Sequence, residues 1–223
     1  MYRLIIESST EKGLIVCAKE KELLFKKEFL CGQTQADHLM PCLQDLFKSC
    51  SLSAALLQCI AVGVGPGSYT GIRVAASVAQ ALAFSRQIPI IELSSLSGFI
   101  AQPPKENYAA IIDARIAGVY IQKNVGEVSL EETFSPDICS LEQLKSYLGE
   151  INYLVTPNCS SLQMKLKKID PEKEWQWEER FPCAHALIDR VDLAYRQKKF
   201  KEAGKLQLLY LKKTFAERQK RDL

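Results

Sequence analysis

Residues 59–86, "CIAVGVGPGSYTGIRVAASVAQALAFSR", decide the fold class of this 223-residue chain. They begin with a wholly apolar run at 59–65, which is typical of a strand buried on both faces of a sheet. A glycine-rich turn follows, and residues 69–86 then carry the long apolar pattern of a helix. A buried strand that passes through a tight turn into a helix indicates an α/β protein.

Three strands and a helix are expected before this stretch. "YRLIIESS" alternates loosely, "LIVCAKE" and "ELLFKKEFL" follow it, and the charged pairs between them predict the turns of a meander. "TQADHLMPCLQDLFKSC" has apolar residues at helical spacing, with Pro41 expected in the first turn, where its missing N–H costs little. After residue 86 we expect a strand at "IPIIEL" and a short helix at "SSLSGFIAQ".

A domain boundary is expected at 102–107, "QPPKEN", where two prolines and then charges separate two apolar elements. The same order of elements then begins again. Three strands, a helix, a strand, a helix and a strand form a ribonuclease-H-like unit. Two such units, at 1–103 and 104–223, predict the actin-like ATPase (ASKHA) fold. The later elements are expected at "YAAIIDA", "GVYIQKN", "VSLEETF", "SLEQLKSYLG", "NYLVTP" and "SSLQMKLKK", then an irregular "DPEKEWQWEERFP", a long helix at "AHALIDRVDLAYRQKK" and a closing "LQLLYLKK".

The composition is that of an ordinary globular protein, with 47% hydrophobic and 25% charged residues. No apolar run approaches the ~20 residues of a membrane span, and the N-terminus is not typical of a secretory signal. We therefore expect a cytoplasmic protein without membrane contact. Its eight cysteines are irregularly spaced and are expected to be buried free thiols. His38 and His185 have no other metal ligand at a useful spacing, so no metal site is expected.

The formal net charge of +3 is unevenly distributed along the chain. Residues 196–223 contain ten Lys or Arg against three acids, which leaves the rest of the chain at −4. Such a segment is either a solvated helix or a surface for nucleic acid or an acidic partner. Both interpretations remain open.

The glycine-rich turn at 65–73 also has two interpretations. Backbone N–H groups at a helix start suit a phosphate, and Arg73 in the first helical turn favours a nearby anion. However, Ile72 and Arg73 stand where a Walker phosphate loop needs Lys-Ser/Thr. The spacing therefore favours a rigid corner in which glycines relieve strain around Pro66 and Ser68 caps the helix. Under either interpretation the residues concerned are Gly65, Gly67, Ser68, Thr70, Gly71 and Arg73.

The helix after the turn carries small side chains along one face, including three alanines spaced at 76, 79 and 83. Small side chains let two helices approach each other closely. This face either packs under the protein's own sheet or docks on a helix of another chain. The helix at "DHLMPCLQDLF" is a second candidate for such a docking surface.

Residues 63–96, "GVGPGSYTGIRVAASVAQALAFSRQIPIIELSSL", closely resemble the signature of the bacterial TsaB (YeaZ-like) family. Residues 65–73 fit the family pattern Gly-Pro-Gly-Ser-Phe/Tyr-Thr-Gly-Leu/Ile-Arg throughout. "IIDARIAGVY", "ADHLMP" and "LLYLKK" resemble three further elements of the family. The chain departs from the family's usual residues at Gln35, Ala36, Gly118 and Lys212.

The resemblance implies the actin-like ATPase fold and a partner subunit in making threonylcarbamoyladenosine on transfer RNA. It implies three partners: a TsaD-like catalytic subunit, a TsaE-like ATPase, and transfer RNA. In such a complex the partner transfers the threonylcarbamoyl group, and this chain scaffolds and activates without catalysis. We expect no tightly bound nucleotide on the chain itself, and we expect ATP to bind only within the complex. The pairing surface that the resemblance implies lies on the two helices, at Leu39, Leu43, Leu46, Ile72, Ala76, Ala79 and Ala83. An exposed apolar face also predicts self-pairing when the chain is alone.

A stand-alone kinase or ATPase of the same fold is the first alternative. Glu7, Asp113 and Arg73 would then serve metal and phosphate. Against this, the first hairpin, "ESSTEKG", has no glycine before Gly13, so the close approach of backbone to phosphate is compromised. Asp113 and Arg115 also have a structural interpretation, as an ion pair that ties a hairpin turn.

A glycoprotease-like hydrolase is the second alternative. A zinc-dependent enzyme would need a histidine-based site, and the chain has only two histidines. A hydrolase built on Ser68 and His185 would lack the G-x-S-x-G elbow that exposes the nucleophile. Both gaps favour the non-catalytic interpretation.

Overall fold

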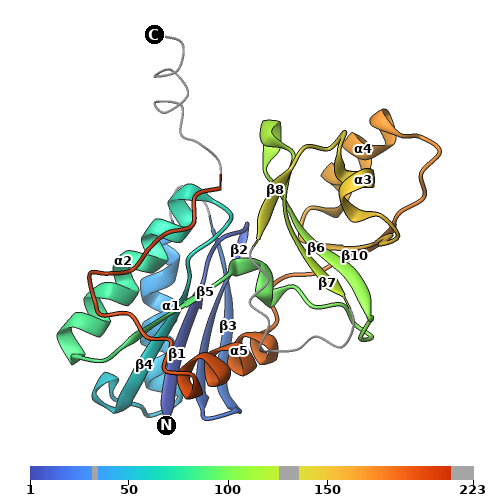
Figure 1. Ribbon diagram of the computed structural model, residues 1–223. Helices are drawn as coiled ribbons and strands as arrows, with labels where there is room; N and C mark the ends of the chain where they lie inside the picture. Colours follow the sequence, from blue (N-terminus) through green and yellow to red (C-terminus); the bar gives the residue numbers. More distant parts are fainter. Residues whose placement is uncertain (32–34, 126–135, 212–223) are drawn as a thin grey trace.

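Two five-stranded mixed sheets form the frame of the molecule (Figure 1), and the computed structural model describes residues 1–31, 35–125 and 136–211. The first sheet has the strand order β3-β2-β1-β4-β5 and the second the order β10-β9-β6-β7-β8. Read from the opposite edge, the second order repeats the first, with β6, β7 and β8 in the places of β1, β2 and β3. The protein is therefore two ribonuclease-H-like units in tandem, called here the first and the second unit.

The first unit begins as an antiparallel meander, and β4 and β5 then lie parallel to β1. Helices α1 and α2 cover one face of this sheet, and their apolar faces pack against the apolar side chains of the strands to form one core. The apolar run of β4 from residue 59 to 63 is buried on both faces, as its sequence predicts. The elements are β1 (Tyr2–Glu7), β2 (Lys12–Lys19), β3 (Glu22–Leu30), α1 (Gln35–Ser49), η1 (Ala54–Leu56), β4 (Leu57–Gly63), α2 (Tyr69–Arg86), β5 (Ile90–Leu93) and η2 (Ser95–Gly98).

The second unit repeats this layout with shorter helices. α3 and α4 cover one face of its sheet, and Leu96 of η2 and Phe99 just after η2 pack against the other face. The elements are β6 (Asn107–Asp113), η3 (Arg115–Ala117), β7 (Val119–Val125), β8 (Asp137–Cys139), α3 (Leu144–Leu148), β9 (Tyr153–Thr156), α4 (Cys159–Ile169), β10 (Gln176–Glu179) and α5 (Ala184–Arg196). The strand expected at "VSLEETF" lies outside the described residues, and the irregular "DPEKEWQWEERFP" contains the short strand β10.

The chain returns to the first unit after β10. Helix α5 packs Leu187, Ile188 and Val191 against the face of the first sheet that is opposite to α1 and α2. Arg3 in β1 donates a buried hydrogen bond of 2.7 Å to Asp192 in α5, and both side chains are less than a tenth exposed. The boundary at 103/104 stays a prediction. Helix α5 and the residues after it as far as Leu209 pack on the first unit, and Leu211 packs on the second.

Residues 200–211, the C-terminal strap, run from α5 around the edge of the first sheet to the start of α2 (Figure 1). Lys201 forms a two-hydrogen-bond bridge with Ile90, and the Leu209 N–H donates to the Val64 carbonyl at 2.8 Å. The strap packs Leu206 and Leu209 against the α1/α2 core. "LQLLYL" is therefore extended but forms no named strand, and the two lysines of that segment lie outside the described residues.

Pro41 lies inside α1, beyond the first turn in which the sequence predicts it. Proline is disfavoured in a helix interior, because it lacks the N–H and its ring clashes with the preceding turn. Here the buried side chains of Leu39, Leu43 and Leu46 hold both flanks of Pro41 on the sheet. Packing therefore outweighs local propensity. Among the described helices, none is both long and apolar enough to cross a membrane.

Candidate functional site

The glycine-rich turn is a corner between β4 and α2, and it carries a cis bond between Gly65 and Pro66. Gly65 has φ +106°, a conformation that strongly favours glycine. The Ser68 Oγ accepts a hydrogen bond from the Gly71 N–H at 3.2 Å, which confirms Ser68 as the N-cap of α2. The residue types of the turn therefore serve its sharp change of direction.

The corner packs directly on the loop that follows β1. The Ser68 N–H donates to the Ser9 carbonyl at 2.7 Å, and the Ser8 hydroxyl donates to the Gly71 carbonyl at 2.8 Å. A Cβ on Gly67 would lie 2.4 Å from the Ser9 carbonyl oxygen, and a Cβ on Gly71 would lie 2.0 Å from that of Ser8. Backbone of the first loop thus occupies the side of the corner where a cradled phosphate would have to lie. Two amides that such a phosphate would use, those of Ser68 and Gly71, already donate within the protein.

Arg73 is held by two tyrosines. Its guanidinium lies 4.0 Å from the centre of the Tyr69 ring, and its Nε donates to the Tyr210 hydroxyl at 2.8 Å. The two tyrosine rings contact each other, with centres 5.2 Å apart. Cation–π contact and the hydrogen bond explain why a cation is tolerated in the first turn of α2. Arg73 therefore fastens the C-terminal strap to the corner, while Thr70 is exposed beside it.

Glu7, at the end of β1, lies beneath the corner and is 1% exposed. Its Oε1 accepts from the Ser9 N–H at 2.7 Å, and its Oε2 has no hydrogen-bond partner among the described residues. Burial raises the pKa of Glu7, although the polar groups of Ser9 and Ser95 beside it act in the opposite direction. A Cβ on Gly63 would lie 1.8 Å from Oε2, so the backbone of β4 closes this side of the carboxyl.

Asp113, at the end of β6, has a different environment from Glu7, because several donors surround its carboxylate. Lys165 of α4 contacts its Oδ2 at 2.6 Å, Ser161 donates to the same oxygen at 3.0 Å, and the Arg115 backbone N–H donates to Oδ1 at 2.7 Å. Burial acts to raise the pKa of Asp113, but these hydrogen bonds outweigh it and hold the pKa below its usual range. The ammonium of Lys165 thus occupies the position that a cation on this carboxylate would take.

Lys165 is the partner that sequence reasoning missed. The expectation paired Asp113 with the side chain of Arg115, whereas Arg115 contributes its backbone N–H and Lys165 forms the ion pair. The signal available in the sequence is the spacing of Ser161 and Lys165, four residues apart on one face of α4. That spacing places both side chains over the same point but does not say which strand end lies beneath them.

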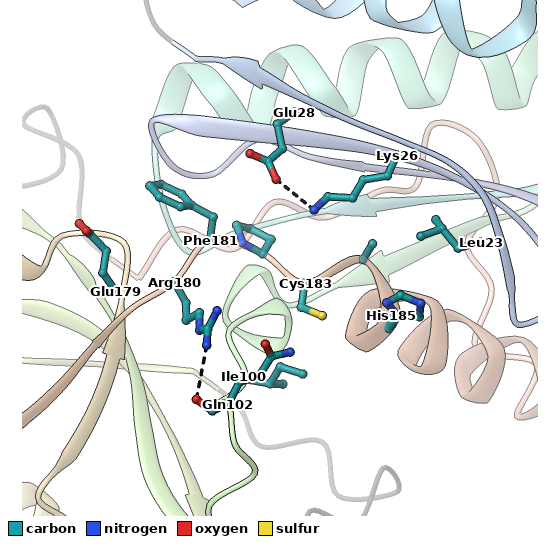
Figure 2. A pocket seen from close by; sticks show the side chains of 12 residues that line it. Leu23, Lys26, Glu28, Ile100, Gln102, Glu179, Arg180, Phe181, Cys183 and His185 are labelled. Atoms are coloured by element: carbon teal, nitrogen blue, oxygen red, sulfur yellow. Dashed lines mark hydrogen bonds and ion pairs between the residues drawn. The ribbon is translucent and has the colours of Figure 1, made fainter. Parts of the chain in front are cut away.

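A cavity of about 360 Å³ lies between the two connectors that join the units and strand β3 (Figure 2). Within its lining, Lys26 contacts Glu28 at 3.1 Å, and Arg180 donates to the Gln102 carbonyl at 3.4 Å. His185 also lines this cavity, in the first turn of α5. Since α5 and α2 cover opposite faces of the first sheet, His185 and Ser68 lie apart, and a hydrolase built on this pair is excluded.

The seven side chains assigned to partner pairing lie inside the first unit. All are at most 4% exposed, and they pack in the core between the sheet and the two helices or directly beneath α2. The apolar stripe of each helix therefore faces the sheet, which corrects the residue assignment. The exposed apolar side chains of the same helices are neighbours of those seven, notably Met40 at 48% and Phe84 at 75% exposure. The seven buried positions to which this correction applies are Leu39, Leu43, Leu46, Ile72, Ala76, Ala79 and Ala83.

Known proteins resemble this chain in both sequence and structure. The family model of TsaD, tRNA N6-adenosine threonylcarbamoyltransferase, matches residues 30–165. The tRNA threonylcarbamoyladenosine biosynthesis protein TsaB of Haemophilus influenzae is 31% identical over 163 residues, which cover 67% of this chain and 68% of that protein. The chain belongs to the TsaB family. The TsaB protein of Bacillus subtilis is 36% identical over 139 residues, which cover 61% of each chain.

The TsaB fold extends over nearly the whole chain. The crystal structure of a Pseudomonas aeruginosa protein with similarity to peptidase YEAZ matches with a TM-score of 0.79, and the match covers 95% of this chain and 99% of that one. Its sequence identity is 23%, so this similarity shows the fold alone. Together with the repeated strand order, it confirms the predicted ASKHA architecture of two tandem units.

Proposed function

We propose that the chain is a non-catalytic subunit in the synthesis of threonylcarbamoyladenosine on transfer RNA. Its place in the TsaB family supports the pathway, because the Haemophilus influenzae relative is named for that biosynthesis. A TsaD-like catalytic subunit is the direct partner, and a TsaE-like ATPase and transfer RNA join through the complex. The modification of transfer RNA takes place in the cytoplasm.

The state of the two carboxylates supports the absence of catalysis. Glu7 and Asp113 stand at equivalent strand ends, where an enzyme of this fold needs a carboxylate free for metal and phosphate. Glu7 is buried against the Gly63 backbone, and Asp113 is paired with Lys165. The proposal rests on this observation, that neither carboxylate is free to bind a metal ion or a phosphate-bound metal. The chain alone then binds no nucleotide tightly, and ATP is a ligand only of the complex.

The solvent-facing side of α1 and α2 is the proposed pairing surface. Phe84 is the most exposed of its apolar side chains, and Ala81 lies one turn away on the same face of α2. Met40 and the half-buried Phe47 extend the surface over α1. Large side chains surrounded by small ones suit anchoring contacts, because a buried aromatic contributes much of the binding energy of an interface. Two copies of the chain pair through the same face when no partner is present.

Binding of a purified TsaD-like subunit tests the proposal. Phe84→Glu and Ala81→Glu each place a charge on the exposed face without entering the core, so both should fold. We expect each to weaken the complex by roughly 30-fold or more, as for the loss of an interface hot spot. Met164→Glu, at a side chain 65% exposed on α4, is the matched control and should bind like the wild type.

Light scattering gives the stoichiometry and calorimetry the affinity. Unchanged binding in both α2 variants would show that the interface with the TsaD-like subunit does not include this face of α2. Failure of the wild-type chain to bind a cognate TsaD-like subunit, combined with tight ATP binding by the chain alone, would favour the kinase or ATPase alternative.

A further inference from the structure

Tyr69, Arg73 and Tyr210 form an exposed cluster, called here the arginine cluster, where the C-terminal strap meets the first turn of α2. Tyr69 is 46% exposed and Tyr210 is 39% exposed, although their rings contact each other. The Arg73 guanidinium lies 4.0 Å from the centre of the Tyr69 ring and 5.7 Å from that of the Tyr210 ring. Two aromatic surfaces and a positive charge therefore face solvent together.

The hydrogen bonds within the cluster leave most of the Arg73 donors unused. Its Nε donates to the Tyr210 hydroxyl at 2.8 Å, whereas neither terminal nitrogen has an acceptor among the described residues. No carboxylate in the described part of the chain forms an ion pair with Arg73. A guanidinium presents its N–H donors in a planar fork that matches the oxygens of a phosphate. Arg73 therefore retains both the charge and the donors that bind a phosphate.

A cation–aromatic pair in the second unit shows what distinguishes the arginine cluster. Lys123 lies 4.2 Å from the centre of the Tyr147 ring, and the Tyr147 hydroxyl donates to the Asp137 carboxylate at 3.2 Å. The carboxylate beside that pair offsets the lysine charge and repels other anions. Over residues 1–31, 35–125 and 136–211 no carboxylate pairs with Arg73, so its charge faces an anionic partner without such an offset.

The sequence after the cluster adds positive charge. Lys212 and Lys213 come two and three residues after Tyr210, and residues 212–223 contain five Lys or Arg against two acids. Such an excess of charge attracts polyanions over a distance. Among polyanions, a nucleic acid also uses the tyrosines, because its bases stack on aromatic rings. A single strand fits better than a duplex, since neighbouring bases cover the base faces of a duplex.

We propose that the arginine cluster binds single-stranded RNA. An unpaired base stacks on the exposed tyrosine rings, and the unused N–H groups of Arg73 donate to an adjacent phosphate. The inference rests on the proposed function for the identity of this RNA, which is an unpaired segment of transfer RNA. It deepens that function, because it gives transfer RNA a direct contact on this chain.

Binding of a labelled RNA to the isolated full-length chain tests the cluster and needs no TsaD-like subunit. The probe is a fluorescein-labelled oligoadenylate of about 12 nucleotides, and the readout is fluorescence anisotropy at low salt. We expect Tyr69→Leu, which removes the ring but keeps an apolar side chain, to weaken binding by about 10-fold. Tyr69→Phe keeps the ring and should bind like the wild type. With a duplex of the same length, Tyr69→Leu should make no difference.

Arg73 is tested against a matched arginine of the same helix. Arg73→Gln and Arg86→Gln remove the same charge from opposite ends of α2, and both side chains are exposed. Arg73→Gln should weaken binding and reduce the slope of log affinity against log salt by about 0.7, the value for one phosphate of a single strand. Arg86→Gln should leave affinity and slope unchanged.

The inference is overturned if the wild-type chain does not bind the single strand, or if Tyr69→Leu and Arg73→Gln bind it like the wild type. Equal losses in the two arginine variants would also overturn it, because binding would then follow net charge alone. So would weaker pairing of Tyr69→Leu with a TsaD-like subunit when RNA binding is unchanged, since the cluster would then be a protein contact. A wild-type chain that pairs with the subunit but not with RNA overturns the inference and leaves the proposed function standing.

Discussion

The ends of β1 and β6 hold equivalent positions in the two units, and each ends in a carboxylate. In the first unit Glu7 is 1% exposed, backed by Gly63 and left with one unpaired oxygen. In the second unit Asp113 keeps a lysine, a hydroxyl and a backbone amide as partners. One carboxylate is therefore disfavoured as an anion and the other is stabilised as one. Equivalent positions of the two units therefore hold a carboxylate in two opposite electrostatic states.

The largest expected effect comes from a steric clash between the corner at 65–73 and the loop that follows Glu7. Gly71→Ala places a Cβ 2.0 Å from the Ser8 carbonyl oxygen, so the corner or the loop has to move. Overpacking of this kind costs about 3 kcal/mol in the free energy of unfolding. Chemical denaturation measures the loss.

Gly149→Ala in the second unit is the control for that variant, because its Cβ meets no atom within 4 Å. Its φ of +60° still disfavours alanine, at a cost of about 1 kcal/mol. Equal losses in the two variants would contradict the tight contact between the corner and the first loop.

Lys165→Met should produce the next largest effect. It removes the ammonium from Asp113 while keeping the length and apolar stem of the side chain. The Asp113 side chain is 12% exposed and that of Lys165 is 35% exposed, so the pair lies between a surface and a buried ion pair. We expect a loss of about 1–2 kcal/mol at pH 7, measured by denaturation.

The loss should depend on pH. The pKa of Asp113 is lowered in the folded protein, so its contribution is present above the unfolded value of 3.8 and disappears as the pH falls through the folded pKa. Wild type and Lys165→Met should therefore converge at low pH. A difference that persists once Asp113 is protonated in the folded protein would show that the lysine acts through packing.

Glu7→Gln should give a smaller change with the opposite pH dependence. The pKa of Glu7 is raised in the folded protein, so Glu7 of the unfolded chain ionises first as the pH rises through 4.5. The wild type therefore loses stability between that pH and the folded pKa. Glutamine does not ionise and escapes this loss. Unfolding measured from pH 4 to pH 8 should show the variant gaining on the wild type as the pH rises, and a variant that falls behind would contradict the assignment.

Tyr210→Phe should have the smallest effect. It removes the hydrogen bond to Arg73 but keeps the ring contact with Tyr69. At this exposed site we expect a loss of about 0.5–1 kcal/mol. Amide hydrogen exchange should show it locally, as faster exchange at Leu209, whose N–H bonds to Val64. Exchange confined to the second unit would contradict the role of Arg73 in fastening the strap.

The strand and helix order could be read from the sequence because apolar periodicity reports directly which residues face a sheet. The same periodicity does not distinguish a face that meets the protein's own sheet from one that meets a partner, so the prediction that Ala76 and Ala79 contact a partner rests on the family resemblance alone. Lys165 and Tyr210 were missed for another reason. Each acts on a residue more than 50 positions away, and no local pattern encodes such a pairing.

The C-terminal strap and α5 determine when the first unit can finish folding during synthesis. Asp192 lies 189 residues after its partner Arg3, and the corner at 65–73 is fastened only when Tyr210 has been made. A ribosome must therefore translate almost the whole chain before the sheet that it made first is covered on both faces. Until then the apolar surface of that sheet that awaits α5 is open to chaperones and to other nascent chains.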